Sequence, residues 1–454
     1  MLLGEVFDRF AAESPVSVMA RAAFEHALPA DAVDALFAEH ADRQYTRELL
    51  FSQLVDLMGS VVCRVQPSLN AAIRKRAADL RVTRKAVYAK IARIEPELGA
   101  ALVRHTAARL APVVTELGLG PVAGVPGFRV RVIDGSHLPG TDHRLGPLRR
   151  TRAAALPGQA VVLFDPASGL IVDAIPCEDA HAQERSLTAA VLDRVEPGLV
   201  WVGDRNFCTT QLLAGTAGRG GCFAVRQHGQ TLTELRAEGR VNCGRTATGV
   251  VFEEAVRVSD GAGGELAIRR VTVALDAPTR AGDREVRVLT NLPATVSAAQ
   301  VAELYRGRWG IEGAFGELAA ALHGEVAGLG YPRAALFAFA VALCAYNVLA
   351  AVKSGVRAAH GAAAGPGVSG YHVANEVAGA SRGLLIAIPA AEWAVFARVS
   401  AGGLAEVLVT LGRQVKVAEF VTSPRGPKKP RPRQQSGAGI WHVATARLLK
   451  AGTL

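Results

Sequence analysis

The sequence lacks cysteine pairs of the kind that build zinc sites or disulfide frameworks. Its six cysteines are scattered over 454 residues, none forms a Cys-x-x-Cys pair, and no histidine spacing completes a zinc pattern. Zinc fingers and small disulfide-stabilised secreted domains depend on such patterns. The sequence therefore excludes those classes and favours a reducing compartment, the cytoplasm.

The sequence also lacks a secretory signal at its start. MLLGEVFDRF brings acidic residues within ten positions and has no long apolar core, so we expect no signal peptide. Only one apolar run, 334–352, has about the length of a membrane span. It is rich in alanine, contains Asn347 and directly follows an expected helix. We therefore expect a buried core helix, with a membrane span as the alternative.

Basic residues outnumber acidic residues in this sequence. The chain has 51 Lys and Arg against 41 Asp and Glu, a formal charge of +10, and a pI of about 9.6. Such a balance fits a polyanionic partner, DNA first, although a generally basic protein without one is the plainer alternative. Half of the residues are hydrophobic, which excludes a disordered chain, and the length allows two or three domains.

Three acidic residues have local contexts that indicate one metal site. Asp134 in VRVIDGSHL and Asp204 in LVWVGDRNF end short strand-like runs, and Glu312 in LYRGRWGIEGAF lies on an expected helix. Three clustered carboxylates need a cation, and Mg²⁺ prefers carboxylate oxygen. Two such ions activate an attacking water or hydroxyl and stabilise the leaving oxygen of a phosphodiester. The sequence therefore predicts metal-dependent phosphoryl transfer on nucleic acid.

These strings resemble the DDE transposases of bacterial insertion sequences. VIDGSHLPGTDHRL, VGDRNF and Tyr305-x-x-Arg308-x-x-x-Glu312 carry the resemblance, which extends to about Asn347. It is strongest to the branch named after insertion sequence number four, with its Tyr-Arg-Glu-Lys signature. The resemblance implies that Asp134, Asp204 and Glu312 are catalytic and hold two Mg²⁺, with Mn²⁺ as a substitute.

The same resemblance implies what the protein acts on. It would bind terminal inverted repeats of double-stranded DNA as a homodimer on paired ends, cleave the strands, and join them to a target DNA. We expect a bacterial, nucleoid-associated protein of the cytoplasm that does not bind membranes. A metal nuclease of another RNase H-like family is an alternative, but it leaves the Tyr305–Arg308–Glu312 block unexplained.

The sequence departs from the family at one position. The signature lysine lies seven residues after the glutamate, where this chain has Ala319. Arg306 is nearby but is expected off the face that carries Tyr305 and Glu312. We expect a weaker grip on DNA or a contact from elsewhere. A catalytically weak or inactive transposase-derived DNA-binding protein, acting as an inhibitor, is therefore a second hypothesis.

The order of expected elements predicts an α/β fold. A strand ending at Asp134, a hairpin over 159–175, a helix over 181–195 and a strand over 199–203 follow the order of an RNase H-like catalytic domain with a mixed sheet. Strand-like runs after residue 230 predict a β-strand insertion, and the start of the chain predicts an N-terminal helical domain. The expected parts are 1–120, helical and DNA-binding; 126–229, first part of the catalytic core; 230–292, β insertion; 293–420, second part of the core with a helical C-terminal region; and 421–454, a basic Pro-rich arm and a short terminal helix.

The N-terminal region contains a pattern that resembles a helix-turn-helix. AAIRKRAADLRVTRKAVYAKIARI predicts two short helices meeting at 80–82, with Thr83 capping the second. The second helix of such a motif enters the major groove. Arg84 and Lys85 are therefore candidate DNA contacts, and an ordinary helical hairpin with a solvated basic face is the alternative.

Further candidates surround the acidic residues. Spacings of three and four place Tyr305, Arg308 and Glu312 on one helix face, so Arg308 and Tyr305 can contact phosphate while Glu312 binds metal. The plainer alternative is a surface Arg–Glu pair beside a half-buried Tyr. Arg205 and a basic loop with Arg149 and Arg150 are further candidate phosphate contacts. Other acids compete for the metal role: Asp142, Asp165, Asp173, Glu178, Asp179 and Glu184.

Overall fold

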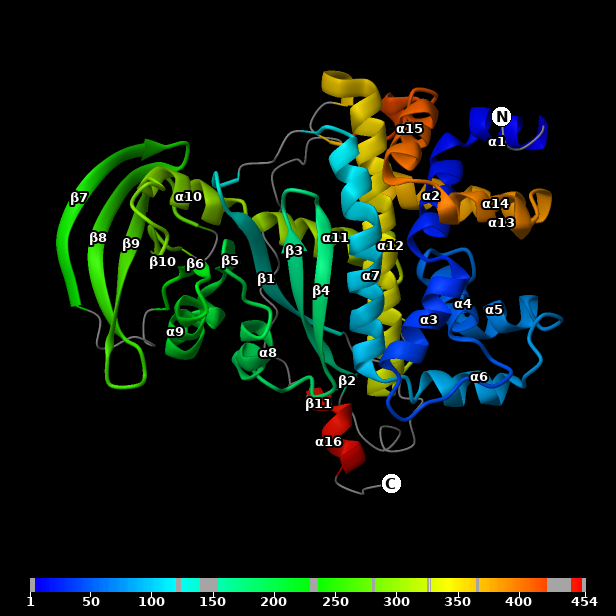
Figure 1. Ribbon diagram of the computed structural model, residues 1–454, viewed down its shortest axis with the longest axis horizontal. Coiled ribbons are helices and arrows are strands. Elements are labelled where there is room, and N and C mark those ends of the chain that lie inside the picture. Colours follow the sequence, from blue (N-terminus) through cyan, green and yellow to red (C-terminus); the bar gives the residue numbers. More distant parts are fainter. Residues whose placement is uncertain are drawn as a thin grey trace.

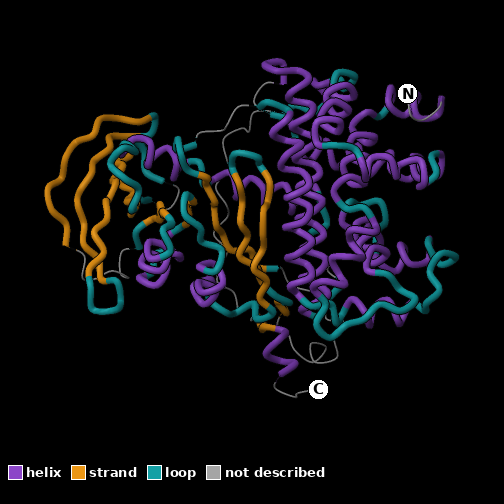
Figure 2. Tube along the Cα trace, viewed as in Figure 1, coloured by secondary structure: helices purple, strands orange, loops and turns teal. Residues whose placement is uncertain are grey.

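The computed structural model describes residues 5–119, 124–138, 154–228, 236–279, 282–324, 326, 328–364, 367–422 and 442–450. Within them, one large sheet and a block of helices lie side by side (Figure 1). Figure 2 shows the strands gathered in one half of the molecule and most helices in the other. α11, Trp309–Ala321, lies beside the strands of the sheet (Figure 1).

The sheet has the strand order β4-β3-β1-β5-β6-β10-β9-β8-β7. β1 runs parallel to β5, β5 runs parallel to β6, and β3 lies antiparallel between β1 and β4. This arrangement of the first five strands is consistent with the RNase H-like fold expected from the sequence. The bounds are Arg129–His137 for β1, Gln159–Asp165 for β3, Leu170–Cys177 for β4, Leu199–Gly203 for β5 and Cys222–Arg226 for β6.

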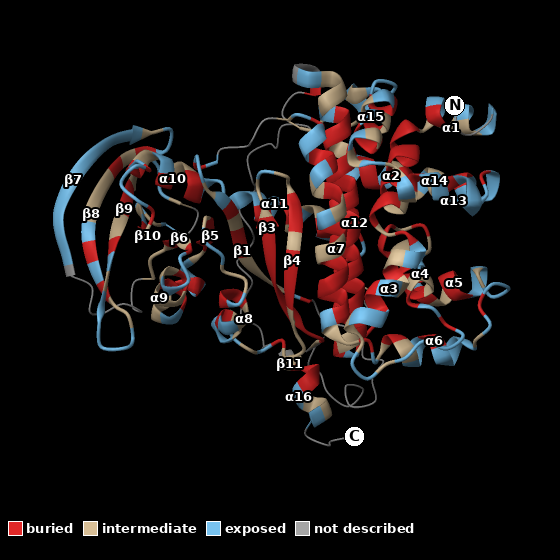
Figure 3. Ribbon diagram, viewed as in Figure 1, coloured by how far each residue is buried: buried red, intermediate tan, exposed pale blue. Residues whose placement is uncertain are grey.

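The strands between the second and third acidic residues continue the same sheet. β10 pairs with the edge of β6, and β9, β8 and β7 follow in antiparallel order. β7 forms the outer edge and is largely exposed (Figure 3). The β-rich insertion therefore hydrogen-bonds onto the core sheet through β6. Its strands are β7 Arg236–Thr246, β8 Gly249–Ser259, β9 Glu265–Leu275 and β10 Glu285–Thr290.

Both faces of the core sheet are covered, because strand residues alternate between two apolar clusters. Val132 and Val202 pack on the face of the main core, whereas Ile133 and Trp201 join a second cluster with residues of α8 and α9. α7 and α12 pack against β4 on the main-core side. These helices are α7 Pro96–Glu116, α8 Thr188–Leu192, α9 Thr210–Gly218 and α12 Pro332–His360.

α12 is the centre of the helical block. Its most apolar window has the length and hydropathy of a membrane span and is entirely buried inside the protein, as the red ribbon of Figure 3 shows. Asn347 is also buried there, and its side chain donates to the carbonyl of Ile171 and accepts from that residue's N–H on β4. The burial agrees with the prediction of a core helix.

Short helices surround α7 and α12. They are α1 Glu5–Glu13, α2 Pro15–Ala27, α3 Ala30–His40, α4 Phe51–Val62, α5 Leu69–Lys75, α6 Arg84–Ile91, α13 Gly370–Ala387, α14 Ala390–Arg398 and α15 Ala401–Gly412. Two helices, α5 and α6, occupy the region of the expected pair, but they do not meet at 80–82, because α5 ends at Lys75 and residues 76–83 separate it from α6. The Thr83 hydroxyl accepts from Ala86 N at 3.2 Å, as the capping prediction required. Both helices lie beyond α7 and α12 as seen from the sheet (Figure 1).

The C-terminal described segment returns to the sheet. β11, His442–Ala444, pairs in parallel with β2, Ala154–Leu156, and α16, Thr445–Lys450, follows it. The expected short terminal helix is therefore present, and Arg447 on it pairs with Asp179 at 2.8 Å. The Pro-rich part of the expected arm lies outside the described residues.

Three expected elements differ in extent. The first strand continues past Asp134 to His137, because antiparallel pairing with β3 extends to Gln159. The helix expected over 181–195 is shorter, consisting of the 3-10 turn Glu184–Leu187 and then α8. The helix expected through Glu312 is two helices, α10 Ala298–Arg306 and α11 Trp309–Ala321, separated at 307–308. A capping box of Ser297 and Gln300 opens α10.

Candidate active site

Asp134 and Asp204 are neighbours across two parallel strands. Ile133 on β1 pairs with Gly203, the last residue of β5. Asp134 and Asp204 follow these two residues directly, and neighbouring strands lie roughly 5 Å apart in the hydrogen-bonding direction. The Asp204 carboxylate accepts from Asn206 N at 2.8 Å, and this contact starts a short 3-10 turn. The pairing of β1 with β5 thus brings together two carboxylates that are 70 positions apart in the sequence.

Glu312 reaches the same region through Arg308. The guanidinium of Arg308 donates to Asp134 Oδ2 at 3.3 Å and to Glu312 Oε1 at 2.7 Å. Its side chain is 10% exposed, whereas that of Glu312 is 55% exposed. The break at residues 307–308 makes Arg308 the first residue before α11. Arg308 therefore forks onto two carboxylates in this structure, and its Nε is buried without a hydrogen-bond partner.

Tyr305 completes this group from the end of α10. It is 8% exposed, and the Arg308 guanidinium carbon lies 5.9 Å from its ring centroid. Burial raises the pKa of the Tyr305 hydroxyl, with opposing effects from Arg308 and Arg226. Arg308 therefore contacts Glu312 and lies beside the Tyr305 ring, although the predicted single helix is broken between Tyr305 and Glu312. Tyr305 is buried rather than free to stack on a base.

The electrostatics at Asp134 show an excess of negative charge. The pKa of this carboxyl is raised to about 6, chiefly by burial, and the charges of Asp204 and Glu184 add to the rise while Arg308 opposes it. A carboxylate whose pKa lies near the operating pH is characteristic of functional sites, although structural charge networks produce it too. One arginine thus compensates the charge of this cluster only in part.

Glu184 is the functional candidate that the sequence placed only among competing acids. A Cβ on Gly135 would lie 1.9 Å from Glu184 Oε1, so this carboxylate rests directly on the glycine after Asp134. Its other oxygen accepts from the Asn206 side chain at 3.2 Å. Burial raises the pKa of Glu184, and Asp204 adds to the effect. The signal in the sequence was the glycine itself, since close approach often requires one.

The other competing acids are engaged elsewhere. Asp173 pairs with Arg104 at 3.0 Å and also with Arg194. The remaining partners are Arg131 for Asp165, Arg333 for Glu178 and Arg447 for Asp179. Asp142 lies outside the described residues. Each of these described acids therefore has an arginine partner, as Asp134 has in Arg308.

Carboxylate oxygens are the donors that a hard divalent cation takes. In this conformation, no three His, Cys, Asp or Glu side chains of the described residues are close enough together to hold a metal ion. The donor chemistry nevertheless fits, because Asp134 and Asp204 adjoin and their negative charge is only partly compensated. Glu312 is held toward Asp134 by Arg308, whose guanidinium supplies positive charge between them.

The predicted DNA contacts fall in three places. Arg205 is exposed directly beyond Asp204, beside the carboxylates. Arg84 and Lys85 are exposed at the start of α6, far from them across α7 and α12. Arg149 and Arg150 lie outside the described residues. The structure thus brings only Arg205, Tyr305 and Arg308 to the acidic cluster.

At Ala319 the side chain is exposed on α11. Arg306 pairs with Glu303 at 2.6 Å and supplies no charge there, in keeping with the expectation that it points away. A different arginine lies close: Arg64 Nη2 donates to the carbonyl of Ala320 at 2.9 Å. Its backbone has φ of 60°, a left-handed conformation that is strained for a non-glycine residue. Nothing in the sequence pattern pointed to Arg64.

Residues 126–348, just under half of the chain, match the family described as "Transposase DDE domain". This match supports a DDE transposase. No curated protein matches the sequence significantly. A solved structure of a piggyBac transposase synaptic complex with hairpin DNA is similar with a TM-score of 0.39, at 10% identity over 78% of each chain. A similarity that low supports no conclusion.

Proposed function

We propose, from the transposase DDE domain that residues 126–348 match, that this protein is a cut-and-paste DNA transposase. It binds the terminal inverted repeats of its element, cleaves the strands and transfers them to target DNA. The observation that carries the proposal is that Arg308 joins Asp134 on β1 to Glu312 on α11, while the pairing of β1 with β5 sets Asp204 beside Asp134. These residues are distant in sequence, and a shared phosphoryl-transfer site accounts for their meeting.

In this proposal the three carboxylates hold divalent ions, Mg²⁺ or Mn²⁺, two of them by the resemblance to insertion-sequence-four transposases. When bound, such ions polarise a phosphodiester and lower the pKa of an attacking water. Arg308 orients Asp134 and Glu312 beforehand. When the Arg308 guanidinium is not paired with Glu312, its two parallel N–H donors can bind a pair of phosphate oxygens.

The helix pair α5 and α6 is assigned a separate role in end binding. Arg84 and Lys85 are exposed on α6, whose buried face is anchored by Val87 and Ile91. Because α6 lies across α7 and α12 from the carboxylates (Figure 1), one monomer would grip DNA at two separated places. Assembly as a homodimer on paired ends belongs to this proposal, as does a location with the bacterial nucleoid in the cytoplasm.

A second candidate is a catalytically weak or inactive DNA-binding protein that inhibits transposition. Ala319 favours it, because the signature lysine and its charge are missing. The retained Asp134, Asp204 and Glu312, in contact through Arg308 or across paired strands, favour the enzyme.

The test is cleavage of labelled DNA carrying the terminal repeat of the element, with Mg²⁺, with Mn²⁺ and with EDTA. Metal-dependent nicking at the repeat boundary, followed by joined products, supports the transposase. Specific binding without cutting in either metal supports the inhibitor. Nicking without any joined product would instead indicate a nuclease.

A further inference from the structure

A polar cavity of about 670 Å³ opens at the carboxyl ends of the three parallel strands. His137 ends β1, Arg205 and Asn206 follow β5, and His228 follows β6, and all four line the cavity. In open α/β sheets, ligands bind outside the carboxyl ends of strands where the chain order switches sides. β1 is such a point here, because β3 continues the sheet on one side of it and β5 on the other.

The opposite wall is a loop held in place from several sides. The buried side chain of Gln159 donates to the carbonyls of Asp179 and Ala182. Asp179 accepts from His181 N at 3.0 Å and pairs with Arg447. This wall contributes the residues Ala180, His181, Ala182, Gln183, Glu184 and Arg185. Its anchoring shows a preformed cavity rather than a gap beside a loose loop.

The lining of the cavity favours an anion. Arg185 and Arg205 carry full positive charge, and neither pairs with a carboxylate in the parts of the chain that the structure describes. Glu184 is the single acid among the lining residues. One of its oxygens accepts from the Asn206 side chain, and the other lies against Gly135. Thr209 caps the amino end of α9 at the cavity, and the partial positive charge of a helix amino end adds to the effect.

A metal is the obvious alternative ligand for a cavity with several histidines. Among the described residues, however, no three potential ligands are close enough to hold one. The volume falls within the range of cavities that enclose small organic ligands. A phosphate-bearing organic anion therefore fits the lining better than an ion.

We propose that this cavity is a subsite for one nucleotide of the DNA strand, next to the bond that is cut. Arg185 and Arg205 bind its phosphate, and the remaining volume takes sugar and base. The assignment rests on the proposed function, because Arg205 and Asn206, which line the cavity, directly follow Asp204 of the proposed metal site. Glu184 stands between the two regions, touching Gly135 on the acidic side and Asn206 on the cavity side.

The experiment measures binding of the full chain to a short, labelled single-stranded thymidine oligonucleotide by fluorescence anisotropy, in EDTA and over a series of KCl concentrations. Arg185→Ala with Arg205→Ala is expected to raise Kd roughly tenfold per arginine. The slope of log K against log salt should fall in magnitude by roughly 0.7 for each phosphate that is no longer bound by an arginine.

A second variant tests the volume without changing charge. Ala182→Trp fills the cavity while the backbone carbonyl that Gln159 binds is kept. It should weaken oligonucleotide binding and lower the salt slope in the same way. Arg129→Ala with Arg219→Ala is the matched control, because these exposed arginines lie at the opposite ends of β1 and α9.

If the Arg185/Arg205 variant and Ala182→Trp both bind like the control pair, or if the unmodified chain fails to bind the oligonucleotide, the cavity is not a nucleotide subsite. Cleavage of terminal-repeat DNA with Mg²⁺ is measured in parallel. If these variants bind the oligonucleotide more weakly but the unmodified chain shows no metal-dependent cleavage, the proposed function is wrong. The assignment of a nucleotide-binding cavity would then still hold.

Discussion

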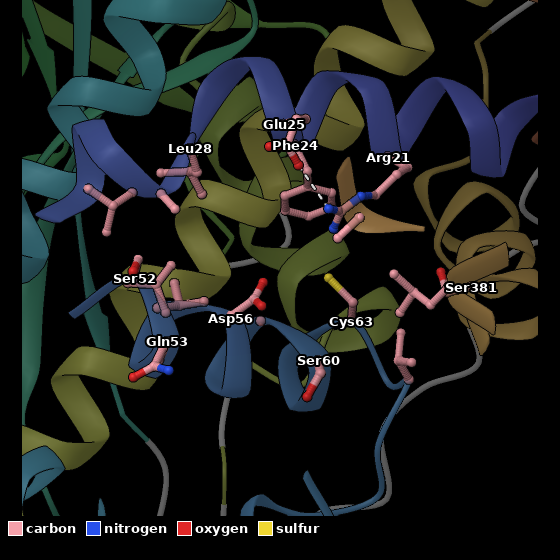
Figure 4. Close-up of a pocket in the computed structure, with 18 of the residues that line it drawn as sticks. Arg21, Phe24, Glu25, Leu28, Ser52, Gln53, Asp56, Ser60, Cys63 and Ser381 are labelled. Carbon is pink, nitrogen blue, oxygen red and sulfur yellow. Dashed lines mark hydrogen bonds and ion pairs between the residues drawn. The ribbon is translucent and has the colours of Figure 1, made fainter. Parts of the chain in front are cut away.

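Two cavities among the described residues lie in different parts of the fold and differ in how their charged groups are paired. The one at the strand ends is lined mainly by loop residues, whereas the other, of about 440 Å³, lies between the N-terminal helices and the helices α12 to α14. Figure 4 shows the latter, with Arg21, Phe24 and Glu25 on α2 facing Asp56, Ser60 and Cys63 at α4. Its walls are mostly apolar, and its main charges form pairs such as Arg21–Glu25 at 2.8 Å.

The difference shows how position in the fold decides what a hollow can do. Helices packed by apolar side chains leave gaps whose charged groups are already matched, so little remains to bind a charged ligand. Strand ends present loops whose polar groups point to a common place, and a rigid sheet keeps them there. Partly compensated charge is found at Asp134 and at the cavity beyond Asp204, and no predicted site residue lines the helical cavity.

The largest contrast should appear when a carboxylate is neutralised. Asp134→Asn is expected to lower cleavage of terminal-repeat DNA by about 10³-fold or more, because a metal ligand contributes several kcal/mol to the transition state. End binding should change little, since Arg84 and Lys85 lie across the molecule. The control is Asp165→Asn, a turn carboxylate that pairs with Arg131. Normal cutting by Asp134→Asn would overturn the metal-site assignment.

The acidic cluster should also make stability depend on pH when no metal is present. The folded pKa of Asp134 is raised to about 6 from an ordinary value of 3.8. Its contribution to stability is therefore present below about pH 4 and is lost as pH rises through 6. The loss reaches about 3 kcal/mol. Denaturant unfolding in EDTA measures it, and Asp134→Asn should flatten the curve between pH 4 and 7. An unchanged curve in the variant would contradict the shifted pKa.

A pair of glycine substitutions separates the two regions directly. Gly135→Ala places a Cβ against Glu184 Oε1 and must displace that carboxylate. A misplacement of about 1 Å in a catalytic group can cost about 10²-fold in rate, so cleavage should fall by up to that amount. The flexible Glu184 side chain can move aside, so the fold should survive, which circular dichroism and the unfolding midpoint check. Cleavage at the wild-type rate would remove Glu184 from the site.

The matching change in the helical region is Gly59→Ala. Gly59 lines the apolar cavity within α4, and a Cβ there meets nothing within 4 Å. Alanine in place of glycine inside a helix stabilises by about 0.5–1 kcal/mol. We expect a higher free energy of unfolding with unchanged cleavage and DNA binding. Reduced cleavage in this variant would show that the helical cavity influences the site after all.

Much of the fold and site could be predicted because the relevant signals are local. Alternation of apolar residues marked β1, a short apolar run marked β5, and Thr83 marked the start of α6. The helix periodicity of Tyr305, Arg308 and Glu312 runs through the break at Arg308 and concealed it, although Gly307 and Gly310 flank this residue and glycine is a poor helix former. The sequence could not rank Glu184, whose importance comes from its approach to Gly135, 49 positions earlier.

By itself, the sequence predicted which groups are candidates for the chemistry: Asp134, Asp204 and Glu312, the arginine near Glu312, and an alanine at position 319 where the family has a lysine. Side-chain identity fixes what a group can bind, and strand or helix periodicity fixes its local direction. Tertiary structure alone decided that Arg308 joins two carboxylates, that Glu184 adjoins them, and that Arg185 and Arg205 share a cavity. Those relations depend on the pairing of β1 with β5 and on the packing of α11, which no local pattern encodes.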